Sequence, residues 1–150
     1  MIEPLSSFPT LHPLVVHAPI VLLPLAPLLL LVAWAYNSRV MEWVATILVA
    51  FGWIGALLAS KVFHPHTGDI SMLAREAFEH HEFWADWTQG LAPAALLTLL
   101  ILSGHWFARF LQTLKIGALL LCLAAAVAVT IAGHYGAMLT HVYKVEVEME

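Results

Sequence analysis

Four long apolar runs divide the sequence, and their length constrains the fold more than any other feature. An α-helix needs about 20 apolar residues to cross the hydrocarbon core of a bilayer. Four windows meet that length, at about residues 14–36, 41–63, 80–107 and 114–142. Hydrophobic residues form 61% of the chain and charged residues only 11%, which is too apolar for a soluble domain. We therefore expect one all-α domain over residues 1–150, an integral membrane four-helix bundle that runs up-down-up-down.

The third run begins with a polar and aromatic segment. Its helical pattern starts near Arg75, and the chain becomes membrane-embedded from about Gly90. The Trp and Phe side chains at positions 83 to 87 favour an aromatic belt at the membrane surface over the wall of a cofactor site. In the second run, Gly52, Ala56 and Ser60 recur every four residues and predict a smooth stripe for close helix packing.

Because four spans are an even number, both termini and the long connection between the second and third spans lie on one side of the membrane. The two short connections carry Arg39, Arg109 and Lys115 against a single acid, Glu42. The side with the termini also carries three basic residues, so the positive-inside rule does not decide the orientation by count. Arg39 directly follows the first span and favours termini outside. We expect a multi-pass protein of a bacterial inner membrane with periplasmic termini.

Charge and cysteine content exclude several kinds of site. The net charge is −4 with six basic residues, so the chain lacks the basic surface that nucleic-acid binding requires. Cys122 is the single cysteine, which rules out an internal disulfide, a cysteine-rich zinc site and covalent haem attachment. Membrane lipid is an expected partner, and nucleic acid is not.

Eight of the nine histidines fall on the side of the termini. Ionisable residues inside a membrane are costly, which favours a functional role for the embedded ones. Counted from the far end of their spans, His17 and His134 each lie 19 residues along. At about 1.5 Å per residue both are about 28 Å deep, and we expect them to face each other. His141 shares a helix face with His134 about 10 Å farther out, and His81 is expected at that outer level.

Residue type alone does not decide what these histidines bind, since neutral imidazole is a ligand of haem iron, copper and zinc. Bis-histidine ligation of haem b, with one or two haems, suits the diagonal helix pairs of a four-helix bundle. The diagonals would pair His17 with His81 or His80, and His64 with His134 or His141. The first of these pairs requires the third span to end early, near Leu102. An outer-face copper or zinc site is the alternative, although no H-E-x-x-H motif is present. The candidate ligands are His17, His134, His81, His141 and His64.

Two motifs at the ends of the chain resemble those of a known family. The opening from Leu11 to Ile20 is similar to L-H-P-x-x-V-H-F-P-I, with Ala18 in place of the usual Phe. The segment from Gly133 to His141 is similar to a G-H-x-G-x-x-L-T-H close. The family comprises small four-helix bacterial predicted membrane proteins of unknown function, some of them fused to c-type cytochrome modules. His81 matches a histidine of this family, and His80 is an adjacent competitor.

The resemblance implies a respiratory setting. It favours a b-type cytochrome-like membrane subunit with a histidine-ligated haem near the periplasmic face. Such a protein would transfer electrons between quinol and a c-type cytochrome or larger redox complex, as an electron-transfer subunit rather than an enzyme by itself. A non-catalytic accessory or anchor subunit of a membrane complex is a second hypothesis, and the copper or zinc site is the third.

Overall fold

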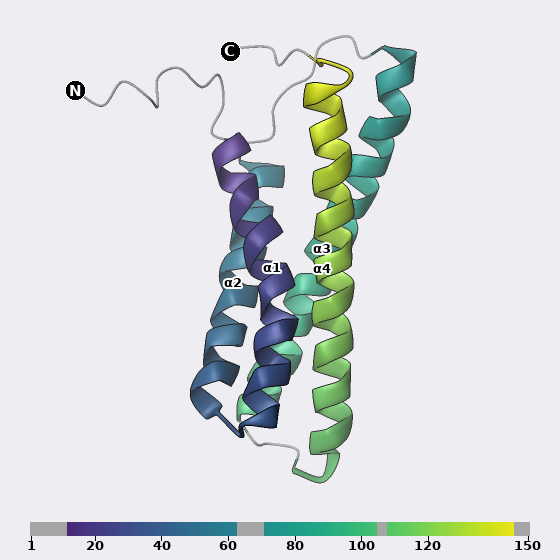
Figure 1. The fold of residues 1–150 in the computed structure, drawn as a ribbon. Coiled ribbons are helices and arrows are strands. Elements are labelled where there is room, and N and C mark those ends of the chain that lie inside the picture. The colour runs from purple at the N-terminus through teal and green to yellow at the C-terminus, as the bar shows by residue number, and fades with distance from the viewer. Residues whose placement is uncertain (1–11, 63–70, 105–107, 146–150) are drawn as a thin grey trace, which may run out of the picture.

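The computed structural model describes residues 12–62, 71–104 and 108–145, which form four long helices (Figure 1). They are α1 (His12–Ala35), α2 (Arg39–Lys61), α3 (Met72–Ser103) and α4 (Leu111–His141), and a short 3-10 turn, η1 (Ala108–Phe110), leads into α4. All four helices are long and apolar enough to cross a membrane. The start of α1 and the end of α4 lie at the same end of the bundle. The predicted all-α, up-down-up-down membrane bundle is therefore confirmed.

The helices are arranged as two tightly packed pairs. α1 packs mainly on α2, and α3 packs mainly on α4. Smaller contacts join α2 to α3 and α1 to α4, whereas α1 and α3, like α2 and α4, barely touch. These last two pairs are therefore the diagonals of the bundle. We call the end where α1 begins the termini end, and the end where α1 turns into α2 the short-loop end.

Small side chains fill the interior and large ones cover the outside. Of the 21 buried hydrophobic residues among those described, 14 are alanines. Large apolar side chains such as Leu28, Phe51 and Leu97 are exposed. Lipid solvates these side chains as well as a protein interior does, so helix association in a membrane depends on close packing of small residues. The distribution is that of a bundle surrounded by lipid.

Glycine on α2 brings α2 close to α1. A Cβ placed on Gly52 would lie 2.8 Å from Leu23 Cδ2, and one placed on Gly55 would lie 2.9 Å from Pro19 Cδ. Both glycines are buried. Ser60, one or two turns further along α2, accepts a 3.1 Å hydrogen bond from Gln89 Nε2 of α3. The predicted stripe of small residues therefore packs against α1 at one end and contacts α3 at the other.

α3 differs from the predicted third span at both ends. It begins at Met72, where the hydroxyl of Ser71 accepts from the Ala74 amide, and it ends at Ser103 rather than near Phe107. Arg39 stabilises this end by donating to the Ser103 carbonyl oxygen at 2.8 Å. Ending α3 at Ser103 shifts each of its residues about 6 Å toward the short-loop end relative to the prediction, at about 1.5 Å per residue. This shift changes the level of His81.

Candidate functional site at the termini end

His81 is held against α4 by a backbone carbonyl group. Its Nδ1 lies 2.8 Å from the carbonyl oxygen of Ala132. A carbonyl oxygen only accepts, so Nδ1 carries the proton, and in the neutral ring Nε2 keeps its lone pair. His81 is half-buried, whereas the other four histidines with described side chains are exposed: His17, His80, His134 and His141. His81 is therefore the described histidine best placed to act as an interior ligand.

The two glycines of the G-H-x-G segment explain how α4 fits its neighbours. A Cβ on Gly136 would lie 3.2 Å from His81 Cε1 and 3.3 Å from His81 Nδ1. A Cβ on Gly133 would lie 3.1 Å from Ile20 Cδ1 on α1. Gly136 thus lets the imidazole of α3 approach α4, and Gly133, three residues earlier, lets α1 approach α4.

These contacts place three histidines at one level. Ile20 lies beside Gly133, and His81 lies beside Gly136. His17 precedes Ile20 by less than one turn, and His134 directly follows Gly133. Measured along the bundle axis, both are therefore within about one helical turn, 5.4 Å, of the height of His81. The predicted common level of His17 and His134 agrees with these contacts. The predicted level of His81 beside His141 was wrong, because α3 sits about one turn closer to the short-loop end.

The common level does not bring the exposed rings into the interior. His134 is about 100° around α4 from Gly133 and is exposed. Its ring meets Tyr135 edge-on, with centroids 5.6 Å apart, and Tyr135 stacks on His80 of α3 at 4.9 Å. Tyr135 was not singled out from the sequence, where it occupies the variable position of G-H-x-G. His80 and His81 therefore have separate roles, His80 in this ring stack and His81 toward Ala132.

No group of three or more His, Cys, Asp or Glu side chains suited to a metal ion occurs within the described ranges. The described histidines at this end therefore do not assemble a multi-ligand zinc or copper set of their own. His64, one of the predicted ligands, lies outside the described residues.

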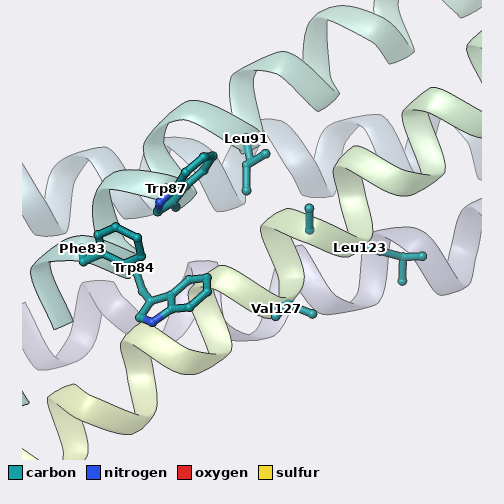
Figure 2. Close-up of a pocket in the computed structure, with 7 residues that line it drawn as sticks. Phe83, Trp84, Trp87, Leu91, Leu123 and Val127 are labelled. Carbon is teal, nitrogen blue, oxygen red and sulfur yellow. The ribbon is translucent and has the colours of Figure 1, made fainter. Parts of the chain in front are cut away.

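An apolar pocket of about 490 Å³ lies between α3 and α4. Figure 2 shows the aromatic side chains of α3 on one side of it and Leu123 and Val127 of α4 on the other. We call it the aromatic groove, lined by Phe83, Trp84, Trp87, Leu91, Leu123, Ala124 and Val127. Phe83 and Trp87 are more than half exposed, as expected for a belt at the membrane surface. The same aromatic side chains also line one side of this apolar pocket.

The fold and these contacts define a four-helix integral membrane protein with histidines and aromatic residues gathered at one end. The chain belongs to the family described as predicted membrane protein (DUF2231), whose model matches residues 9–149. Both end motifs fall within the matched residues. No curated protein and no solved structure matches the chain.

Proposed function

We propose that the protein is a b-type cytochrome-like membrane subunit that would hold haem b at the termini end, with His81 as one of the histidines that bind it. The observation that carries this proposal is the hydrogen bond from His81 Nδ1 to the Ala132 carbonyl oxygen. Ligating histidines almost always donate their second ring N–H to a carbonyl or carboxylate, which fixes the ring and raises its basicity.

The second histidine that would hold the haem in this proposal is His17. Two histidines that bind one haem would come from helices that are well apart. α1 is diagonal to α3, whereas α4 is in direct contact with the His81 ring. His17 is at the level of His81 and its side chain is exposed, so ligation requires its side chain to turn toward the bundle. His134 and His141 are the weaker candidates because they lie on the helix that His81 already touches.

A bound haem b supplies one-electron chemistry, and the chain supplies the ligands, an apolar surrounding and the control of potential. We place the protein in the bacterial inner membrane with periplasmic termini, as an electron-transfer subunit between quinol and a c-type cytochrome or larger redox complex. The apolar aromatic groove begins within one turn of His81 on α3 and suits a quinol ring. The resemblance to proteins fused to c-type cytochrome modules supports this setting.

The test is a reduced-minus-oxidised spectrum with iron quantitation on protein purified from cells supplied with a haem precursor. We expect haem b bands that are lost in His81→Gln and lost or shifted to a high-spin form in His17→Gln. His80→Gln is the matched control, since His80 is adjacent and exposed, and it should retain the spectrum. Absence of haem b from the unmodified protein, or an unchanged spectrum in His81→Gln, would overturn the proposal.

The same preparations decide the alternatives. An accessory or anchor subunit predicts an intact fold with no haem bands and no effect of His81→Gln on any spectrum. A copper or zinc site predicts stoichiometric metal in elemental analysis. Since the described residues assemble no group of three metal-binding side chains, such a site would need ligands from residues outside the described ranges.

A further inference from the structure

A pocket of about 160 Å³ with polar and apolar lining lies at the short-loop end, at the opposite end of the bundle from His17, His81 and His134. All four helices, or the residues next to them, contribute to it. The lining residues that carry the argument are Trp34, Arg39, Glu42, Leu102, Leu111 and Lys115. The sequence analysis used Arg39, Glu42 and Lys115 only to judge orientation, and the convergence of these side chains is a property of the tertiary structure.

One carboxylate in the pocket is already engaged. Trp34 Nε1 donates to Glu42 Oε1 at 2.7 Å, which joins the end of α1 to the first turn of α2. Lys115 of α4 places its ammonium group 5.5 Å from the centroid of the Trp34 ring, within the range of a cation–π contact. Within the described residues no Asp or Glu forms an ion pair with Lys115. Its positive charge is therefore held beside the pocket by an aromatic face rather than by a carboxylate.

Arg39 contributes a second positive charge at the rim. Its guanidinium donates to the carbonyl oxygen of Ser103, the last residue of α3, where carbonyl groups lack partners within the helix. This contact holds the planar guanidinium at the pocket. Two cations and one carboxylate thus line the pocket, which leaves it with a net positive charge.

The residues around the pocket also carry a net positive charge. The described residues at this end, 36–42, 104 and 108–115, carry three basic residues and one acid. The rest of the chain carries three basic residues and nine acids. Because each of the four candidate spans has one end here, we expect the pocket to lie near the level of the lipid headgroups.

We propose that this pocket binds the phosphate of an anionic phospholipid. Basic pockets between transmembrane helices bind acidic lipid headgroups, and an ammonium with a guanidinium suits a phosphate. The pocket is smaller than the roughly 300–1,000 Å³ of sites for drug-sized ligands, which fits a headgroup and not a large solute. Leu102 and Leu111 add apolar lining for the glycerol and the start of the acyl chains, which free phosphate lacks. The proposal does not depend on haem.

The test compares the protein in nanodiscs of phosphatidylcholine alone and with added phosphatidylglycerol. Both lipids carry a phosphate, but choline neutralises it in the first. We expect phosphatidylglycerol to raise the midpoint of thermal unfolding and to remain bound in native mass spectrometry. Lys115→Gln should weaken this retention about fivefold, the effect of one basic residue near an anionic surface. Glu42→Gln should strengthen it, which gives a readout that misfolding cannot produce.

Arg109→Gln is the matched control, because Arg109 is exposed at the same end and does not line the pocket. It should leave retention nearly unchanged. Equal losses in Lys115→Gln and Arg109→Gln would mean general surface attraction and would overturn the proposal. Equal retention of the two lipids would also overturn it. If excess inorganic phosphate in phosphatidylcholine discs gave the same stabilisation, the lipid assignment would be wrong.

Discussion

His81 and Ala132 join α3 to α4 through a hydrogen bond of 2.8 Å between an imidazole Nδ1 and a backbone carbonyl oxygen. The contact forms because Gly136, one turn after Ala132, has no side chain where the ring lies. The hydrogen bond sets the tautomer of His81, and the missing side chain at Gly136 sets how closely its ring approaches α4. Any side chain at position 136 therefore acts on the proposed ligand directly.

Gly136→Val should displace the His81 ring and weaken its bond to Ala132, because a Cβ alone would already lie 3.2 Å from Cε1. We expect a lower midpoint of thermal unfolding and, if haem is bound, reduced haem content or a shifted spectrum. Gly90→Val is the control, since a Cβ there would meet nothing within 4 Å. An equal effect of the two substitutions would show that the His81 contact is not the cause.

Gly52→Ala should destabilise the α1–α2 pair. The added Cβ would lie 2.8 Å from both Cγ and Cδ2 of the buried Leu23, which has little room to move. Overpacking of this kind costs about 1–3 kcal/mol. The free energy of unfolding can be measured by titration with sodium dodecyl sulfate in mixed micelles. Gly117→Ala, with open space around its Cβ, should be neutral or slightly stabilising.

Ser60→Ala should remove the hydrogen bond between α2 and α3 and leave the Gln89 amide without its described partner. Gln89 Oε1 is already buried without a hydrogen bond in the described structure. Interhelical hydrogen bonds in membranes contribute about 0.6 kcal/mol on average, so we expect a loss of about that size in the same titration. Ser103→Ala is the control, because the Ser103 hydroxyl bonds only within α3, to Leu99. A larger loss from Ser103→Ala would contradict the assignment.

Trp34→Phe should keep an aromatic ring at this position but remove the indole N–H that donates to Glu42. The bond involves a carboxylate in a half-buried site, and we expect a loss of about 1 kcal/mol in the free energy of unfolding. A double-mutant cycle with Glu42→Gln isolates the coupling between the two side chains. Additive effects of the two substitutions would show that the hydrogen bond contributes nothing.

The proposed orientation can be tested with single cysteines at exposed positions near the two ends. Thr140→Cys, near the termini end, should react with a membrane-impermeant maleimide in intact cells, and Gln112→Cys, near the short-loop end, should react only after the membrane is opened. The native Cys122 is 1% exposed and should not interfere. The reverse labelling pattern would place the termini in the cytoplasm.

The sequence by itself determined the four spans, the common side of the termini and the level shared by His17 and His134. These features depend on the length of each apolar run, which is a local property set by the thickness of the bilayer. The family motifs can also be read from the sequence, but the contacts that their residues make cannot. The contacts of Gly133 with Ile20 and of Gly136 with His81 became visible only in the folded bundle.

The tertiary structure decided how the helices slide and rotate against one another. His81 was predicted about one helical turn too far toward the termini end. The reason is that α3 ends where Arg39 contacts Ser103, and this contact joins two distant parts of the chain. The exposure of His134, its contact with Tyr135 and the pocket around Lys115 likewise depend on neighbouring helices. Close packing of small residues sets these relationships to within less than a helical turn, and hydropathy carries no such information.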